Sequence, residues 1–196
     1  MKSDYSDYLM DPAHLENEES EWARQGFYKK NAGAVRDVLQ SRGLKTVVEF
    51  GCGSGWVAYE LGEKGYSNSY IGIDKNPNCI DLAHTRNQYM TFIEGDVRDL
   101  WSFDCDVVCA FAFLKHFSLE EWGSILCHIL EYGKFGVFAV AIADHDLDDG
   151  TDFPHTSVTL EHLDRAVAAA GHKILKTEHQ ADSATGYEML VWTERV

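Results

Sequence analysis

The chain of 196 residues lacks any apolar run of the roughly 18 residues that a membrane-spanning helix needs. Its N-terminus, Met1-Lys2-Ser3, leads into polar residues without a hydrophobic segment, so we expect neither a membrane association nor a secretory signal. Five cysteines occur, and no two of them form a C-x-x-C pair, which disfavours a zinc site or disulfides. Reduced, buried thiols and a cytoplasmic location are therefore predicted.

Basic residues are scarce, since 17 Lys and Arg stand against 32 Asp and Glu, which gives a net charge of −15. Such a field repels phosphate backbones and makes nucleic acid an unlikely partner. The basic residues that do cluster, between positions 29 and 45, form only a modest group. The chain also has no internal repeat, low-complexity segment or interdomain linker, and its length suits one domain with a sizeable core.

Helical patterns alternate with short apolar strands, which predicts an α/β fold with a parallel sheet. The first helix is expected to be interrupted or bent at Gly26 and Gly33. The second half ends in a predicted hairpin of residues 172–177 and 187–193. The other expected strands are 46–50, 69–73, 91–94, 107–111 and 135–142, and the expected helices are 16–42, 55–63, 78–87, 119–132 and 160–170.

The most informative stretch is 47–58, where an apolar strand contains Glu49 and three glycines follow at alternate positions before a helix. We call residues 51–55, which hold these glycines, the glycine loop. Glycine permits left-handed backbone and lets a ligand lie against the main chain, while the opening amides of the helix point into the same space. The dinucleotide fingerprint G-x-G-x-x-G would need a third glycine where Trp56 stands, and Glu49 would repel a pyrophosphate. A nicotinamide-dependent oxidoreductase is therefore disfavoured.

The pattern E-x-G-x-G-x-G resembles motif I of the class I S-adenosylmethionine (SAM)-dependent methyltransferases. In that family the loop lies against the methionine part of SAM, and the acidic residue acts near by. SAM carries an ammonium and a sulfonium, so an acidic residue suits it electrostatically. The resemblance spans about residues 47–196 and assigns cofactor contacts here to Glu49, Gly51, Cys52, Gly53 and Gly55.

The resemblance also implies an architecture. It predicts a three-layer α/β sandwich, with a mostly parallel seven-stranded sheet, an antiparallel C-terminal strand and helices on both faces. Residues 46–196 would form the SAM-binding methyltransferase domain, within a single globular unit. The aromatic-rich segment 1–45 is expected to be helical and to act as a lid, with Tyr28 as its cofactor-contacting residue.

Two further strand ends match the family. Asp74 closes the second strand, where an acidic residue accepts hydrogen bonds from both ribose hydroxyls, and Lys75 and Asn76 would flank the adenine. After the third strand, Asp96 would accept from the exocyclic adenine amine, and the Val97 amide would reach a ring nitrogen. Because the carboxyl ends of parallel strands line the ligand crevice, these positions support one another.

The candidate acceptor side follows the fourth strand. By resemblance, Phe111 approaches the methionine part of SAM and His116 faces the acceptor. A histidine can act as a general base near neutral pH, so His116 is the first catalytic candidate and His155, in a second turn, is another. His145 is a weaker candidate.

The absence of two sequence motifs narrows the possible classes of methyl acceptor. No D/N/S-P-P-aromatic motif follows the fourth strand, and none of the three prolines adjoins a cysteine. These absences argue against two classes of DNA methyltransferase, so a small-molecule acceptor and S-adenosylhomocysteine (SAH) as product are predicted. A protein or nucleic-acid acceptor and a catalytically silent SAM-binding partner subunit stay as alternatives. The assembly is expected to be a monomer or homodimer.

The acidic segment 144–149 partly matches a calcium-binding loop. Asp144, Asp146 and Asp148 alternate as in a calcium loop, but position six is Asp149 and position twelve is His155. Such partial matches are usually solvated loops, and the fourth strand ends without an acidic partner. No metal site is predicted.

Overall fold

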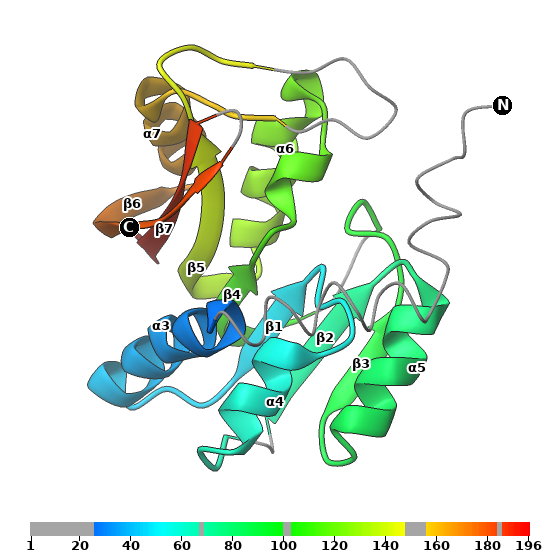
Figure 1. Cartoon of the computed structure of the whole chain (residues 1–196). Helices are drawn as coiled ribbons and strands as arrows, with labels where there is room; N and C mark the ends of the chain where they lie inside the picture. Colours follow the sequence, from blue (N-terminus) through cyan, green and yellow to red (C-terminus); the bar gives the residue numbers. More distant parts are fainter. Residues whose placement is uncertain (1–25, 67–68, 100–102, 148–155, 184–185) are drawn as a thin grey trace, which may run out of the picture. The chain divides into compact units, whose positions relative to one another are not determined.

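A computed structural model of the protein describes residues 26–66, 69–99, 103–147, 156–183 and 186–196 (Figure 1). The chain divides into two compact units, residues 1–99 and residues 100–196. The strands make a seven-stranded mixed sheet, which confirms the predicted α/β fold class.

The first unit contains a parallel sheet in the order β3-β2-β1. Val47 lies opposite Tyr70, and Ile71 lies opposite Thr91. Helix α5 packs against β2 and β3, and α3 packs against α4. The elements are α3 (Phe27–Arg42), β1 (Val47–Phe50), α4 (Trp56–Gly62), β2 (Tyr70–Asp74), α5 (Pro77–Arg86) and β3 (Thr91–Glu94).

The second unit orders its strands β4-β5-β7-β6. Strands β4 and β5 are parallel, whereas β7 runs antiparallel to both β5 and β6, so the prediction of an antiparallel C-terminal strand is confirmed. The elements are β4 (Cys105–Ala110), the 3-10 turn η2 (Leu114–His116), α6 (Leu119–Leu130), β5 (Gly133–Ile142), α7 (Leu160–Ala169), β6 (His172–Ser183) and β7 (Gly186–Arg195).

Local capping chemistry explains where several helices begin. The Asn76 side chain accepts a hydrogen bond from the Asn78 amide at 3.0 Å, and Pro77 occupies the first turn of α5. Ser118 caps α6, and its hydroxyl both accepts from the Glu121 amide and donates to the Glu121 carboxylate. The serine hydroxyl thereby satisfies one of the amides in the first turn of α6 that have no partner within the helix.

Two expectations about elements are wrong. Gly33 does not interrupt α3, because a helix accommodates glycine at a modest free-energy cost; Gly26, with φ of 76°, instead precedes the first turn. Strand β6 continues to Ser183, well past the expected end at 177, because it pairs with β7 along its length through two irregularities. The part of the expected first helix before residue 26 lies outside the described residues.

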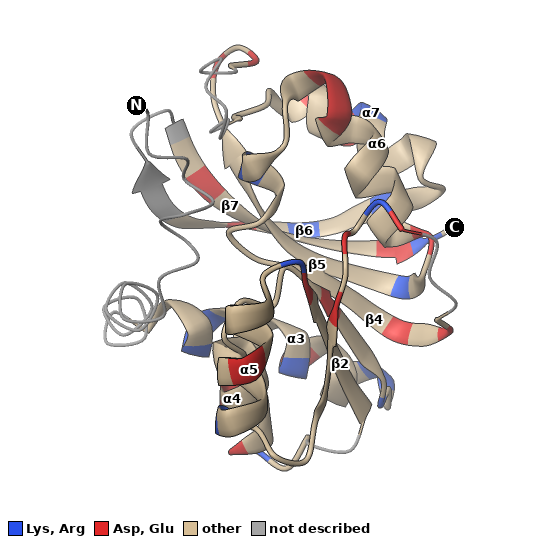
Figure 2. Ribbon diagram, turned by 90° about the vertical axis from the view of Figure 1, so that its right-hand side faces the viewer, with Lys and Arg blue, Asp and Glu red and all other residues tan. Residues whose placement is uncertain are grey.

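The structure also shows the state of the cysteines, the place of the basic residues and the character of the helices. All five cysteines are free; four are buried and Cys127 is half-buried. The modest basic group falls largely on α3 (blue in Figure 2). Within the described ranges, the structure has no helix that is long and apolar enough to cross a membrane.

Candidate cofactor-binding site

The glycine loop is built from left-handed backbone. Gly51, Gly53 and Gly55 have φ angles of 71°, 52° and 78°, values that residues with a side chain rarely adopt. The amides of Gly51 and Cys52 both donate to the carbonyl of Ile73, at 2.8 and 3.1 Å. The loop is thereby tied to the end of β2 immediately before Asp74.

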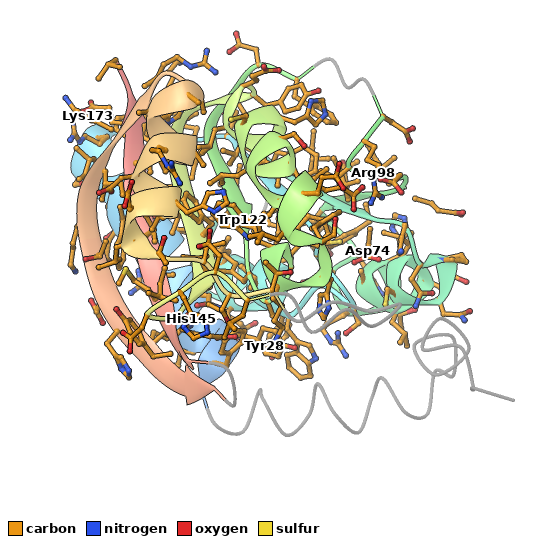
Figure 3. All side chains as sticks on the ribbon, turned by 90° about the horizontal axis from the view of Figure 1, so that it is seen from above. Tyr28, Asp74, Arg98, Trp122, His145 and Lys173 are labelled. Atoms are coloured by element: carbon orange, nitrogen blue, oxygen red, sulfur yellow. The ribbon has the colours of Figure 1, made fainter. Side chains whose placement is uncertain are left out.

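Asp74 joins the glycine loop to the turn that precedes α5 (labelled in Figure 3). One carboxylate oxygen accepts from the Gly53 amide and the other from the Asn76 amide, each at 2.9 Å. Burial raises the pKa of Asp74, and these backbone hydrogen bonds partly offset that rise. Because each carboxylate oxygen can accept more than one hydrogen bond, the residue retains acceptor capacity for a ligand hydroxyl.

Glu49 is 2% exposed and lies beneath the same loop, near the end of β1. The Tyr70 hydroxyl of β2 donates to its carboxyl group. Burial raises the pKa of Glu49 to about 8, the Tyr70 hydrogen bond opposes that rise, and the charge of Asp74 adds to it. At neutral pH the free protein therefore holds Glu49 largely protonated, which the sequence did not indicate.

Cys52 contributes its backbone rather than its thiol to the surface of the loop. Its side chain is buried against β2, where a Cβ placed on Gly72 would lie 2.9 Å from the sulfur. Burial, followed by the charges of Asp74 and Glu49, raises the pKa of the Cys52 thiol well above its usual value. The thiol is consequently a packing group that requires glycine at position 72.

Gly55 packs the end of the loop against α5. A Cβ at this position would lie 2.8 Å from Asn87 Nδ2 and 3.0 Å from the Ala83 Cβ. The Asn87 amide group also donates to the Gly55 carbonyl at 2.9 Å. The third glycine is thus required both by its left-handed φ and by the close approach of a neighbouring helix.

We expect Gly55→Ala to lower the free energy of unfolding by about 2–4 kcal/mol, because a strained φ and an overpacked contact add. Gly33→Ala is the matched control, since a Cβ there meets only Arg36 Nη2 at 3.8 Å within a helix. The control should gain about 0.5–1 kcal/mol. Urea unfolding followed by circular dichroism measures both changes. Equal effects of the two substitutions would contradict the assigned role of Gly55.

The other predicted contact residues of the first unit differ in burial and in their partners. Asn76 is 8% exposed and caps α5, whereas Lys75 is exposed. Tyr28 of α3 stacks on Trp56, with ring centroids 6.0 Å apart and an interplanar angle of 12°. Val97 is buried, with 5% exposure.

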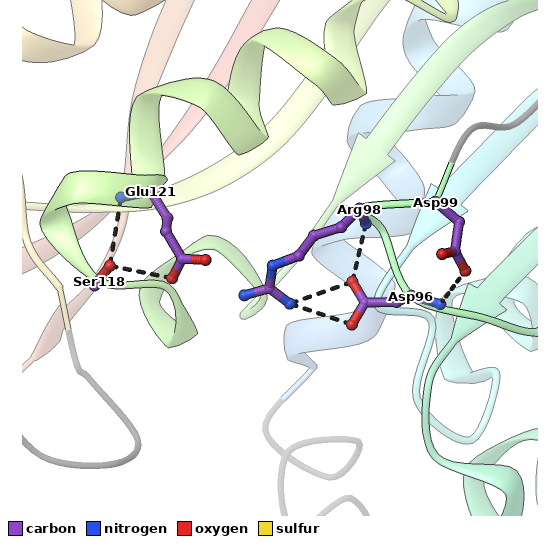
Figure 4. A network of polar contacts seen from close by, with 5 residues as sticks. All are labelled: Asp96, Arg98, Asp99, Ser118 and Glu121. Carbon is purple, nitrogen blue, oxygen red and sulfur yellow. Dashed lines mark hydrogen bonds and ion pairs between the residues drawn. The ribbon is translucent and has the colours of Figure 1, made fainter.

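Asp96 forms a compact network in the turn after β3 (Figure 4). Its carboxylate accepts from the Arg98 amide at 2.9 Å and from Arg98 Nη1 at 3.2 Å. Its own amide donates to the Asp99 carboxylate at 3.2 Å. The carboxylate that the resemblance assigns to the adenine amine is therefore paired with a cation, an arrangement that sequence reasoning missed.

The second unit carries the predicted acceptor-side residues. Phe111 directly follows β4 and is 5% exposed, and His116 ends the η2 turn, where it is half-buried. Between them Ala112 adopts a φ of 51°, which is strained for a residue with a Cβ. Such outliers concentrate at functional sites, but nothing in the sequence marks this one.

Thr156 ties a distant segment to the His116 turn. Its hydroxyl donates to the Phe117 carbonyl at 2.6 Å, and its amide donates to the Lys115 carbonyl at 2.9 Å. These bonds hold the turn on both sides of His116. The neighbouring candidate His155 lies outside the described residues.

The acidic segment 144–149 is represented by Asp146, whose carboxylate accepts from the Thr159 amide at 2.7 Å and lies 2.9 Å from His162 Nδ1. Burial would raise the pKa of Asp146, but the hydrogen bonds from Thr159 and His162 outweigh it and lower the pKa. This carboxylate therefore serves the start of α7. No group of three or more metal-ligating side chains occurs among the residues that the structure describes.

Part of the chain matches a known domain family. Residues 47–136 match a family described as a methyltransferase domain. This range contains the glycine loop, Asp74, Asp96 and the His116 turn. The match covers 90 of the 196 residues of the chain, so a methyltransferase domain is found in this part of it. The predicted resemblance is confirmed.

Several solved methyltransferases have a fold similar to that of this chain. Magnesium protoporphyrin IX methyltransferase from Synechocystis, crystallised with SAH, is 18% identical, with a TM-score of 0.72 over 88% of this chain and 85% of that chain. A Burkholderia thailandensis 1,6-didemethyltoxoflavin-N1-methyltransferase, with its acceptor and SAH, is 17% identical, with a TM-score of 0.72 over 97% and 86%. At these identities the likeness shows the fold.

A sequence match among curated proteins is local. The methionine S-methyltransferase of Zea mays is 38% identical over 52 residues, which are 26% of this chain and 5% of that protein. The matching protein of Hordeum vulgare is 40% identical over 52 residues, with the same coverage. The chain therefore spans a small fraction of the length of the curated relatives that it matches.

Proposed function

We propose that this methyltransferase transfers the methyl group of SAM to a small-molecule acceptor. The observation that carries the proposal is the left-handed glycine loop, which Asp74 ties to the turn after β2. The three glycines leave room for the methionine part of SAM to lie against the main chain. The Asp74 carboxylate can accept hydrogen bonds from the ribose diol of SAM. The net charge of −15 and the small-molecule acceptors named for two structural neighbours support a small acceptor here.

SAM supplies a methyl carbon activated by its sulfonium; an acceptor lone pair forms the new bond while the carbon–sulfur bond breaks, and its electron pair leaves on SAH. The chain's own residues position the reactants, because an in-line displacement depends on alignment. In this proposal the glycine loop, Glu49, Lys75, Asn76, Val97 and Phe111 line the cofactor together with the strand-end aspartates. Tyr28 contributes from the described part of the predicted lid segment 1–45, whose residues 1–25 lie outside the described residues.

Calorimetry with SAM and SAH tests the cofactor assignment directly. We expect saturable binding of both SAM and SAH. In a separate assay, the tritiated methyl group of SAM should be transferred to at least one member of a panel of small phenols, amines and thiols. Absence of SAM and SAH binding would overturn the proposed function. Binding without transfer to any small molecule, accompanied by transfer to a protein or RNA, would replace the acceptor class. Binding without any transfer would identify a silent partner subunit.

We further propose His116 as the general base when the acceptor keeps its proton, with His155 as the second candidate. The bonds from Thr156 on either side of His116 support this proposal, because they hold its turn. His116→Ala should lower kcat by about 10²–10⁴-fold, a typical loss for general-base catalysis. The SAH dissociation constant should change little. A proportional loss of SAH affinity, or an unchanged kcat, would contradict the proposed role.

A further inference from the structure

Arg86, in the last turn of α5, contacts the glycine loop at Ser54. Its Nη1 donates both to the backbone carbonyl and to the hydroxyl of Ser54. Its guanidinium also lies 4.0 Å from the ring centroid of Trp56, the first residue of α4. One side chain therefore contacts two positions on either side of the third glycine.

Ser54 is 1% exposed, so Arg86 donates to a carbonyl and a hydroxyl that are both buried. A buried carbonyl and hydroxyl that lose their hydrogen-bond donor must find another one or move. The three glycines provide no side chains that could resist such a movement. The amides of Gly51 and Cys52 tie the start of the loop to Ile73. Nearer to Ser54, Gly53 is bonded to Asp74 and Gly55 to Asn87, so Ser54 lies between two attachment points.

The Trp56 ring is held by aromatic neighbours as well. Tyr28 stacks on it, and Tyr59 meets it edge-on, with centroids 5.9 Å apart and an angle of 81°. A guanidinium over an indole gains both cation–π and stacking energy, and its planar donors leave Arg86 free to reach Ser54 at the same time. A lysine ammonium cannot reproduce this geometry, because it is a point charge without a planar fork.

We infer that Arg86 is a positioning residue for the cofactor: it holds Ser54 and Trp56 so that the glycine loop keeps the shape that receives the amino-acid part of SAM. The inference rests on the proposed function for its ligand. Because Arg86 contacts Ser54 and Trp56 on either side of Gly55, its effect should be largest on the ligand part that the loop receives.

The test compares two ligands on three variants by calorimetry. SAH contains the amino-acid part, whereas 5′-methylthioadenosine keeps the adenine, ribose and thioether but lacks it. We expect Arg86→Met to weaken SAH binding by about 10–100-fold and to change methylthioadenosine binding by less than about threefold. Arg86→Lys should lose SAH affinity by a similar factor, because charge alone does not replace the two bonds to Ser54.

Arg165→Met is the matched control, since this arginine of α7 has 69% of its side chain exposed and meets only Glu161, at 3.9 Å. It should alter neither affinity. Equal losses for both ligands in Arg86→Met would indicate general destabilisation and overturn the inference, as would unchanged SAH binding.

Failure of the proposed function gives a separate result, because the wild type would then bind neither ligand. If the wild type binds neither ligand, hydrogen exchange of the amides of residues 53–56 in the free protein still tests whether Arg86 holds the glycine loop. Faster exchange in Arg86→Met than in Arg165→Met supports the role of Arg86 in holding the loop. Equal exchange rates in the two variants overturn it.

Discussion

The variant Asp74→Ala is expected to bind SAH at least about 100-fold more weakly than the wild type. The carboxylate accepts the Gly53 and Asn76 amides at 2.9 Å, so its loss releases the glycine loop and the turn before α5 together. Hydrogen bonds to charged groups contribute about 1.5–3 kcal/mol each, and the proposed ribose contacts would be lost in addition. Calorimetric titration with SAH measures the change.

Asp74→Asn should fall between the wild type and Asp74→Ala, because an amide oxygen still accepts one of the two backbone bonds. Asp81→Ala, at an exposed position within α5, is the control and should leave the affinity unchanged. Wild-type affinity in Asp74→Ala would show that the loop binds no ribose-bearing ligand at this strand end.

Glu49 should make the stability of the protein fall as the pH rises. Its pKa is about 8 in the folded protein and near 4.5 in the unfolded chain, so the folded state binds the extra proton between these values. Its contribution is fully present below pH 4.5 and is lost as the pH rises through about 8. The slope over this window is about 1.4 kcal/mol per pH unit.

The comparison of the wild type with Glu49→Gln isolates this effect, because glutamine does not titrate. Urea unfolding of both proteins from pH 5 to 9 should show the wild type losing about 4 kcal/mol relative to the variant. Glu63→Gln, at an exposed position, should keep the wild-type pH dependence. A constant difference between the wild type and Glu49→Gln across this range would mean that Glu49 is ionised throughout, with a cation or water compensating its charge.

The local features of the site could be predicted because they depend on local chemistry. Alternate glycines after an apolar strand require left-handed backbone wherever the chain is placed, and all three have it. Pro77 and Ser118 mark helix starts through groups within a few residues of each other. The strand ends at Asp74 and near Asp96 followed from the same alternation of strands and helices.

The partners of these residues could not be predicted, because they come from distant parts of the chain. Tyr70, which bonds Glu49, is 21 residues away, and Arg86 is 32 residues from Ser54. Arg98 was equally unforeseen, although it is close in sequence to Asp96, since a turn must form before the guanidinium can reach the carboxylate. No periodicity or spacing in the sequence identifies which arginine or tyrosine will contact a given site residue.

From the sequence alone it was possible to determine the order of elements, the glycine loop and the family that these features resemble. Those properties follow from backbone conformational preferences and apolar patterning, which act over a few residues. Only the tertiary structure decided that Glu49 is a buried acid under a tyrosine, that Asp74 spans two backbone amides and that Arg86 reaches Ser54 and Trp56. Burial and long-range hydrogen bonding set these charges and contacts, and both arise only when distant segments pack together.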